Sequence, residues 1–182
     1  MKIYTRTGDK GQTSLSGSER VGKNSGIINL IGTLDELNSF VGVLISSLPA
    51  KHPQKPFLEE IQSTNFQMGA DIANSKSSDK QGSYEVSVLQ LEQQMDLLDK
   101  ELESLKNFIL PGGSGSAAMS HVCRCVARRC ERVFFAAAEN TRLDDSIGRY
   151  INRLSDYFFV LARFLNQESG VDDILWRNSS IS

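Results

Sequence analysis

Hydrophobic residues recur at helical spacing in five stretches of this 182-residue chain. The third stretch is the most regular, with spacings of three and four: Val88, Leu91, Met95, Leu98, Leu102 and Leu105. The last is the densest: Ile147, Tyr150, Ile151, Leu154, Tyr157, Phe158, Leu161, Phe164 and Leu165. Each pattern puts an apolar stripe on one side of a helix, ready to pack against a neighbour. Strand-like alternation is nearly absent, so the chain is predicted to fold as an all-α bundle of five helices.

Capping and helix-breaking residues set the expected helix limits. Thr33-Leu34-Asp35-Glu36 has the spacing of a capping box, so we expect the first helix from Thr33 to Pro49, with the apolar stripe allowing a start one or two turns earlier. A loop that contains Pro53 and Pro56 is expected to lead into the second helix, whose inner face is Phe57, Leu58, Ile61, Met68 and Ile72. The polar residues 74–84 that follow read as a flexible linker. The remaining helices are expected over residues 88–105, 114–140 and 145–168.

The length suits one compact domain over residues 1–182. Within it, residues 1–24 show no helical period and contain Gly8, Gly11, Gly17 and Gly22, so we expect an ordered N-terminal loop there, with a short strand at Lys2–Thr5. Residues 27–168 form the expected helical bundle, and residues 169–182 are a C-terminal tail.

Overall charge argues against nonspecific nucleic-acid binding, because the net charge is −2 and the pI is near 5.7. The distribution is uneven, however. Residues 1–24 and residues 120–135 each carry an excess of three positive charges. Two local basic patches in a slightly acidic protein favour a specific anionic ligand.

Cysteine usage indicates a reducing compartment. Cys123, Cys125 and Cys130 share one predicted helix, and a separation of seven residues spans roughly 10 Å, beyond the reach of a disulfide. With two histidines and no Cys-x-x-Cys, a zinc site is disfavoured. The chain shows neither a signal-peptide pattern nor an apolar run near 18 residues, so we expect a cytoplasmic protein that does not bind membranes.

Two predicted helices carry a band of polar and charged residues opposite their apolar stripe. Each band falls within roughly a 100° arc. The first comprises Arg124, Arg128, Glu131 and Arg132, and the second comprises Arg149, Asn152, Asp156 and Arg163. Solvated i,i+4 pairs would explain such a band equally simply. Two features favour a ligand or an interface instead. Arg129 is expected on the apolar side of its helix, where a guanidinium needs a partner. The helix expected over residues 145–168 supplies Asn152 and Asp156, polar groups suited to a sugar or base.

The N-terminal segment Thr5-Arg6-Thr7-Gly8-Asp9-Lys10-Gly11-Gln12-Thr13-Ser14 offers backbone N–H groups, hydroxyls and cations suited to phosphate. The chain contains no Walker A sequence. Taken alone, Gly-Asp-Lys-Gly is explained as well by a surface turn.

Five sequence blocks, in order, resemble the PduO-type ATP:cob(I)alamin adenosyltransferases. They are the Thr/Gly segment 5–13 with Lys23, Gly32-Thr33-Leu34-Asp35-Glu36-Leu37-Asn38, Phe108-Ile109-Leu110-Pro111-Gly112-Gly113, Arg128-Arg129-Cys130-Glu131-Arg132, and Asn152-Arg153-Leu154-Ser155-Asp156-Tyr157. Cys130 stands where the family commonly has Ala.

The resemblance implies a homotrimer with active sites between subunits, transferring the 5′-deoxyadenosyl group of ATP to the substrate cob(I)alamin. Implied ATP contacts are Thr5, Arg6, Thr7, Gly8, Thr13, Ser14, Lys23, Arg128, Arg129, Cys130, Glu131, Arg132 and Asn152. The residues implied for catalysis are Arg128, Arg132, Lys23 and Asp35, with Asp35 and Arg128 bridging two subunits. Phe108 would contact the corrin, and Glu131 would meet an ATP-bound Mg²⁺. An adenosylcobalamin-dependent enzyme would be the possible acceptor of the product.

Two other functions fit the same residues. A noncatalytic carrier would bind adenosylcobalamin or ATP and deliver it to another enzyme. A helical oligomerisation module would carry the arginines only as a solvated or interfacial surface.

Overall fold

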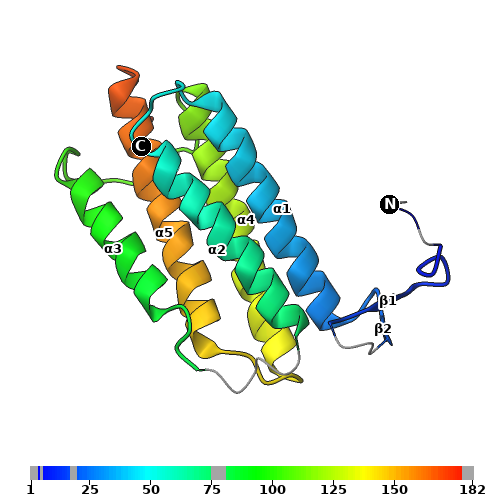
Figure 1. The fold of residues 1–182 in the computed structure, drawn as a ribbon. Coiled ribbons are helices and arrows are strands. Elements are labelled where there is room, and N and C mark those ends of the chain that lie inside the picture. Colours follow the sequence, from blue (N-terminus) through cyan, green and yellow to red (C-terminus); the bar gives the residue numbers. More distant parts are fainter. Residues whose placement is uncertain (1–3, 5, 17–19, 75–80, 178–182) are drawn as a thin grey trace.

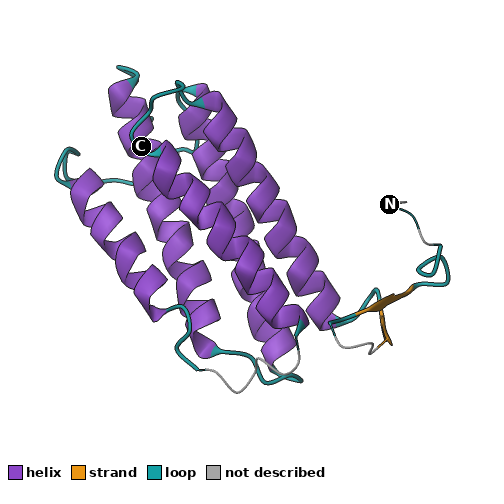
Figure 2. Ribbon diagram, in the orientation of Figure 1, coloured by secondary structure: helices purple, strands orange, loops and turns teal. Residues whose placement is uncertain are grey.

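In the computed structural model, which describes residues 4, 6–16, 20–74 and 81–177, five helices follow a small β-hairpin. The hairpin pairs β1 (Gln12–Ser14) with β2 (Arg20–Gly22) in antiparallel register. The helices are α1 (Gly26–Ser47), α2 (Lys55–Ala73), α3 (Glu85–Asp99), α4 (Gly115–Ala138) and α5 (Asp145–Glu168). Figure 1 shows the helices running side by side, and Figure 2 shows that the described strands are confined to the hairpin. The predicted all-α, five-helix fold is confirmed.

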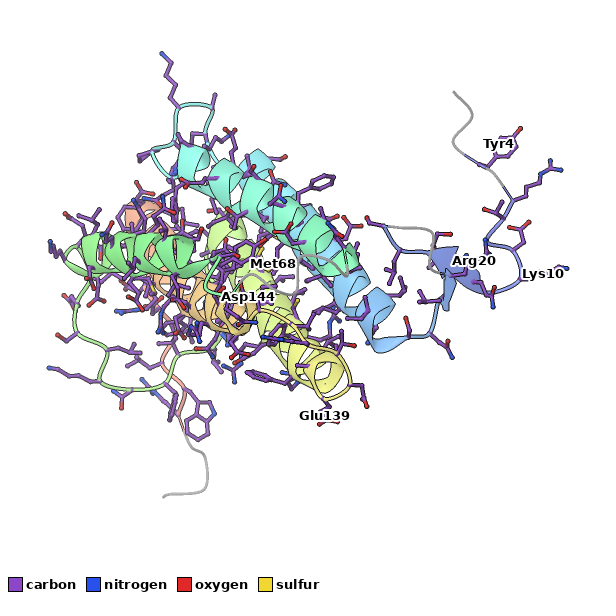
Figure 3. All side chains as sticks on the ribbon, turned by 60° about the horizontal axis from the view of Figure 1, so that its bottom comes forward. Tyr4, Lys10, Arg20, Met68, Glu139 and Asp144 are labelled. Atoms are coloured by element: carbon purple, nitrogen blue, oxygen red, sulfur yellow. The ribbon has the colours of Figure 1, made fainter. Side chains whose placement is uncertain are left out.

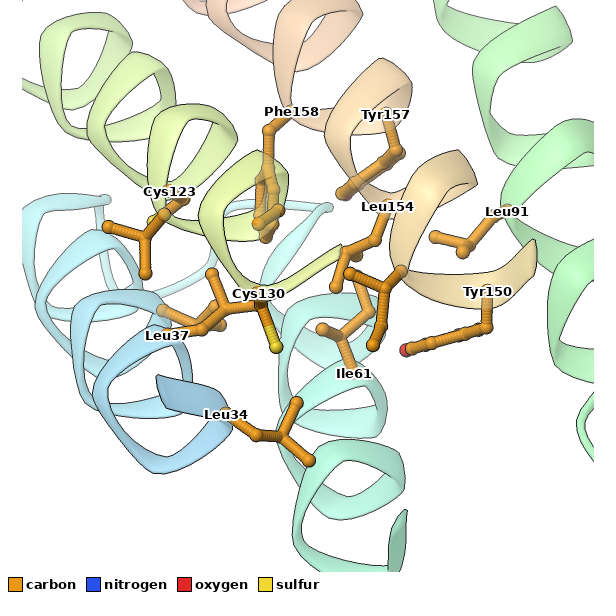
Figure 4. Packing of buried hydrophobic residues seen from close by; sticks show 14 of the residues in the cluster. Leu34, Leu37, Ile61, Leu91, Cys123, Cys130, Tyr150, Leu154, Tyr157 and Phe158 are labelled. Carbon is orange, nitrogen blue, oxygen red and sulfur yellow. The ribbon is translucent and has the colours of Figure 1, made fainter. Parts of the chain in front are cut away.

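Helix α5 lies at the centre of the packing, between α4 and α3, while α1 packs against both α4 and α2. The large buried side chains of α5 include Tyr150, Tyr157 and Phe158. They lie in one core cluster with Leu37 of α1 and Ile61 of α2 (Figure 4). This is the apolar stripe that the spacing predicted. Its burial supplies the main favourable term of folding, roughly 1.5–3 kcal/mol for each fully buried large side chain.

Helix α1 begins earlier than the capping-box prediction, with Ser25 as its N-cap. Thr33 lies inside the helix, where its hydroxyl donates to the Asn29 carbonyl at 2.8 Å. The prediction that Thr33 caps the helix is therefore wrong. Continuous burial of Leu30 and Leu34 explains why the helix extends through that point.

By length and composition alone, α1 could cross a membrane. Its apolar inner face is instead core: Leu30, Leu34, Leu37, Val41 and Leu44 are buried.

Helix α3 ends at Asp99, although its apolar spacing continues to Leu105. Side chains of α5 take up backbone carbonyls beyond the end of α3: the Gln167 amide donates to the Glu101 carbonyl at 2.8 Å and the Arg163 guanidinium to the Glu103 carbonyl at 2.7 Å. Capture of these carbonyls by α5 competes with continuation of the helix. The prediction of helix up to Leu105 is wrong, and Leu105 is 44% exposed.

The described end of the predicted linker is ordered. Asp144, the N-cap of α5, accepts the backbone N–H groups of Gly82 and Ser83 at 3.0 and 2.9 Å. These bonds, with that from Ser146, lower the pKa of Asp144 against the opposing effect of its burial. The flexible-linker prediction is therefore wrong for residues 81–84, while residues 75–80 lie outside the described part of the chain.

Cys123 and Cys130 are fully buried free thiols in the core, whereas Cys125 is exposed. Burial raises the pKa of both inner thiols to about 12. The three thiols are free, as their spacing predicted, and the exposure of Cys125 distinguishes it from the two buried ones.

Candidate functional site

The N-terminal leader, defined as residues 4–24 where described, folds as a glycine turn followed by the hairpin. The Gly11 N–H donates to the Gly8 carbonyl at 3.1 Å, and Gly11 has φ +78°, a conformation that favours glycine. The Lys23 N–H then donates to the Gly11 carbonyl at 2.9 Å. Residues 8–11 and Lys23 are thereby brought together across the hairpin.

Cations gather on this glycine turn. A Cβ placed on Gly8 would lie 3.1 Å from the Lys23 Nζ, so the missing side chain lets the ammonium sit against the backbone. The Arg20 guanidinium donates to the Thr7 carbonyl at 2.8 Å. Thr13 and Ser14 lie on β1, and Thr5 lies outside the described residues. The turn combines backbone donors, hydroxyls and positive charge, as a phosphate cradle requires.

Arg6 adopts φ 60°, which is uncommon for a residue other than glycine. Its guanidinium carbon lies 5.7 Å from the centroid of the Tyr4 ring, a cation–π contact. The sequence carries no local signal for this conformation, because arginine has no special preference for positive φ. Strained backbone of this kind is often found at ligand-binding segments.

Four of the five residues in the predicted α4 block point away from the core. Arg128, Arg129 and Arg132 are exposed and Glu131 is half-buried, while Cys130 is buried among apolar residues. The structure therefore separates the Cys130 side chain from its charged neighbours, and it gives no support to a side-chain contact between Cys130 and ATP.

Arg129 does not enter the apolar side of the bundle, so that prediction is wrong. It forms an ion pair with Glu36 of α1, and both side chains are 45% exposed. The reason is that α1 lies beside α4 and offers a carboxylate at its edge. Asp35, the neighbour of Glu36, is exposed on the same helix.

Arg128 and Arg132 differ from Arg129 in that no ion pair joins either to a carboxylate within the described residues. The Arg132 guanidinium donates to the Arg128 carbonyl at 2.8 Å, which leaves both charges uncompensated. Two neighbouring positive groups without an internal counter-charge favour an anion from outside the protomer.

Asn152 of α5 lies next to this pair. Its Nδ2 donates to Glu131 Oε1 at 2.7 Å, joining the two predicted polar bands. The other residues of the second band form ion pairs elsewhere: Arg149 pairs with Glu85, Asp156 with Arg153, and Arg163 with Asp173. Of that band, Asn152 is the residue for which a hydrogen bond to α4 is described, and its partner is Glu131.

Glu131 is the carboxylate at this surface that could bind a Mg²⁺ ion together with phosphates. Among the described residues no group of three or more His, Cys, Asp or Glu side chains could enclose a metal ion. Mg²⁺ at nucleotide sites is typically held by one or two carboxylates together with substrate phosphates. A single oriented carboxylate beside two arginines fits that mode.

Phe108 lies in the connection between α3 and α4 and is 79% exposed. It packs edge-to-face against Trp176, with ring centroids 6.4 Å apart. Ile109 and Leu175 form an antiparallel bridge, and the Trp176 N–H donates to the Phe108 carbonyl at 2.8 Å. Residues 169–177 show no periodicity that predicts a role for the tail, and the apolar run Ile174-Leu175-Trp176 is the available signal.

His121 is buried on α4, and no motif in the sequence predicts a role for it. It packs against the Phe159 ring, and neither ring nitrogen has a hydrogen-bond partner among the described residues. Burial, with a smaller effect from Arg124, lowers its pKa and favours the neutral imidazole.

A cavity of about 850 Å³ opens between the hairpin and one end of the bundle. Leu15, Ile72, Tyr84, Ala137 and Asp144 contribute to its walls, and Tyr84 donates to Asp71 there at 2.7 Å. None of the site residues predicted from the sequence lines it.

Among the described residues of one chain, no hydrogen bond or ion pair joins the leader to Arg128 or Arg132. Figure 3 shows Tyr4, Lys10 and Arg20 on an arm that extends away from the bundle, and Figure 1 shows this arm leaving the lower end of α1. The two candidate phosphate-binding groups of one protomer therefore face different spaces.

The fold is a five-helix bundle with arginines exposed on α4, and comparison with known proteins specifies the family. A model of the cobalamin adenosyltransferase family matches residues 3–165. The chain is 41% identical to the corrinoid adenosyltransferase of Bacillus subtilis, over all of this chain and 95% of that one. It belongs to the cobalamin adenosyltransferase family, a family of transferases.

Solved structures agree. A phenylalanine-to-alanine variant of the PduO-type ATP:corrinoid adenosyltransferase from Lactobacillus reuteri, complexed with cobalamin and ATP, has a TM-score of 0.90 and 36% identity, covering 97% of this chain and 100% of that one. An arginine-to-lysine variant of the same enzyme, complexed with ATP, also has a TM-score of 0.90 and 36% identity, covering 96% of this chain and 100% of that one. The family resemblance stated from the sequence is confirmed.

Proposed function

We propose that this protein transfers the 5′-deoxyadenosyl group of ATP to cob(I)alamin, giving adenosylcobalamin and triphosphate. One observation carries the assignment to particular residues. Arg128 and Arg132 lie unpaired, within the described chain, beside the Glu131–Asn152 hydrogen bond, in a protein whose solved relatives bind ATP and cobalamin.

The reaction is an in-line displacement. The electron pair of Co(I) forms the bond to C5′ of ATP as the C5′–O5′ bond breaks, and the triphosphate leaves with that electron pair. Reduced cobalt is itself the nucleophile, so the protein needs no catalytic base. Alignment of the two substrates can contribute roughly 7–11 kcal/mol in favourable cases.

The leaving triphosphate requires compensation of its charge. Arg128 and Arg132 would supply it from α4, and Lys23 with the donors of Thr7, Gly8, Thr13 and Ser14 would supply it from the leader. One fixed donor at such a site is worth about 2.7–4 kcal/mol. Glu131 would hold Mg²⁺ together with the phosphates, and the ion would neutralise further phosphate charge.

Asn152 would contact the nucleoside, because its amide is already held by Glu131 close to the arginines. Arg6 and Arg129 would contribute at the edges of the same nucleotide site. Thr5, which lies outside the described residues, is proposed for this site from the family resemblance only.

The assembly is proposed to be a homotrimer in which the leader of one protomer completes the α4 site of another. The support is the direction of the leader, which extends away from its own bundle (Figure 1). Asp35, exposed on α1, would pair with Arg128 of a neighbouring protomer and hold that guanidinium in place.

Phe108 would face the lower side of the corrin and exclude the axial base, since it is a large apolar ring held at an exposed position. Phe108→Ala should lower turnover and the fraction of bound cob(II)alamin that is four-coordinate. An unchanged absorption spectrum of the bound Co(II) form would contradict this role.

The protein is proposed to act in the cytoplasm on small-molecule substrates, independently of nucleic acid and membrane. Its product would pass to an adenosylcobalamin-dependent enzyme. Adenosylcobalamin is the reactive cofactor of radical enzymes, which fits such a consumer.

Anaerobic incubation with ATP and chemically reduced cobalamin tests the function directly. We expect adenosylcobalamin and triphosphate in equal amounts, with inversion at C5′ when ATP carries a stereospecific 5′ deuterium. Binding of both substrates without turnover would indicate a carrier instead, and retention at C5′ would exclude a single in-line step.

A further inference from the structure

Three polar residues, Arg163, Asn166 and Asp173, form a buried network at the end of the bundle that carries Phe108. We call this network the tail latch. Arg163 and Asn166 are only 8% and 3% exposed on α5, and the Asp173 side chain is 18% exposed in the C-terminal tail. A buried guanidinium and carboxylate persist only when they are paired and hydrogen-bonded.

Arg163 holds two segments at once. Its Nε donates to Asp173 Oδ2 at 2.9 Å, and its Nη2 donates to the Glu103 carbonyl at 2.7 Å. The first bond fixes the tail on α5, and the second fixes the start of the α3–α4 connection that leads to Phe108.

Asn166 holds the other end of that connection. Its Nδ2 donates to the Gly112 carbonyl and to Asp173 Oδ1, both at 3.1 Å, and its Oδ1 accepts the Ser114 N–H at 2.9 Å. A Cβ placed on Gly113 would lie 2.1 Å from that oxygen. The backbone at Gly112–Ser114 is therefore fitted closely around the Asn166 amide.

Between these anchors, the connection and the tail pair with each other. The Leu110 N–H donates to the Ile174 carbonyl at 2.8 Å, and Trp176 pairs with Phe108 through both backbone and ring. Two such short strands are only marginally stable by themselves in water. Phe108 and Trp176 remain largely exposed, so their own packing does not fix their position.

We propose that the tail latch is a positioning device for the corrin-facing side chain: Asp173, held by Arg163 and Asn166, sets the place of Phe108 against the tail. These residues act through Phe108 and do not touch the substrate. The inference rests on the proposed function, because it assumes that Phe108 faces the corrin. It adds that the buried polar network determines what fraction of the bound cob(II)alamin is four-coordinate.

The test variant is Asp173→Asn, because Asp173 lies outside the helices and its replacement leaves the bundle core intact. An Asn side chain must turn an NH₂ group toward either Arg163 or Asn166, both of which are donors. Asp172→Asn is the matched control: Asp172 is the exposed preceding residue. Arg163→Lys is a second variant that keeps the charge and loses the two-directional hold of the guanidinium.

Trp176 is the only tryptophan in the chain, so its fluorescence reports tail docking without any substrate. We expect Asp173→Asn to increase the quenching of Trp176 by acrylamide and to lower the four-coordinate fraction of bound cob(II)alamin. Turnover should fall about ten- to a hundredfold, as for a reactive geometry misplaced by about 1 Å. Affinity for ATP and the circular-dichroism helix signal should match those of Asp172→Asn.

Wild-type turnover and a wild-type Co(II) spectrum in Asp173→Asn would overturn the proposal, even if the fluorescence changed. Unchanged fluorescence would overturn the latch itself. If Asp173→Asn lost its helical signal, Arg163→Lys would decide by the same readouts. Failure of the wild-type protein to form adenosylcobalamin would instead refute the proposed function. The two failures can be distinguished, because the fluorescence of Trp176 is measured without substrate.

Discussion

The arginines of α4 and those of α5 are used differently. On α5, Arg149 pairs with Glu85, Arg153 with Glu92 and Asp156, and Arg163 with Asp173. On α4, Arg128 and Arg132 have no ion-pair partner within the described residues. Both helices are amphipathic with a charged band, but only the α4 band leaves arginines without an ion-pair partner within the described residues.

The difference teaches how a binding surface can be told from a solvated one. Exposed pairs such as Arg149–Glu85 contribute about 0–1 kcal/mol and attach α5 to α3. The unpaired α4 arginines contribute no internal ion pair, and their proximity costs electrostatic energy in the absence of a ligand. Their arrangement is explained by a polyanion that compensates both charges.

The variants Arg132→Ala and Arg149→Ala test this difference between the arginines of α4 and those of α5. We expect Arg132→Ala to reduce turnover about 10²–10³-fold, because it removes one fixed donor from the departing triphosphate. Cobalamin affinity should be nearly unchanged. Steady-state kinetics and cobalamin titration check both values, and Arg149→Ala should behave as wild type. Equal losses in the two variants, or equal losses in turnover and cobalamin binding, would contradict the phosphate role.

Asn152→Ala tests the one residue of α5 that joins the α4 site. We expect ATP affinity to fall about tenfold, as for a lost hydrogen bond of roughly 1.4 kcal/mol within the range for side-chain donors. Calorimetric titration with ATP measures it. The control is Ser39→Ala on α1, whose hydroxyl donates only to the Asp35 carbonyl in its own helix. An unchanged ATP affinity in Asn152→Ala would remove this residue from the nucleotide site.

The buried cysteines of α4 predict that the stability of the protein depends on pH. The pKa of Cys123 and Cys130 is raised to about 12 by burial, whereas unfolded thiols ionise near 8.5. The stabilising contribution is therefore complete below about pH 8.5 and is lost as the pH rises toward the folded value. Urea unfolding at pH 7 and pH 10 should show a larger loss in the wild type than in the Cys123→Ala, Cys130→Ala double variant. A loss of the same size in both proteins would refute this contribution.

The smallest expected effect is that of Arg149→Ala on stability. Because Arg149 and Glu85 are about half exposed, the free energy of unfolding should fall by less than about 1 kcal/mol. Urea unfolding measures this value, and high salt should abolish the difference. A loss of several kcal/mol would contradict this prediction, because an exposed ion pair should not stabilise the fold by that much.

Periodicity predicted the elements whose stability comes from one buried stripe. Helices α2, α4 and α5 were located in this way, although α2 begins at Lys55 and so includes Pro56, which was expected in the preceding loop. The start of α1 at Gly26 lies within the two earlier turns that its apolar stripe allowed. The end of α3 was missed, because the carbonyl contacts of Arg163 and Gln167 depend on a tertiary neighbour.

The candidate site was predicted less completely, for the same reason. Sequence spacing placed Arg128, Glu131 and Arg132 on one face, but it could not show which arginines find a carboxylate on another helix. The Glu36–Arg129 pair and the docking of Trp176 on Phe108 join positions far apart in the chain. Neither contact leaves a period or a spacing to detect.

The central claim is that the leader of one protomer and α4 of another converge on one triphosphate, and mixing two inactive variants tests it most directly. Lys23→Ala disables the leader and Arg132→Ala disables the helix. If each site takes its leader and its helix from different protomers, random co-assembly of equal amounts restores about a quarter of the wild-type sites. Restored activity near that level is the predicted result. Mixed assemblies as inactive as either variant alone would show that one protomer supplies both halves of its own site, and would contradict the account.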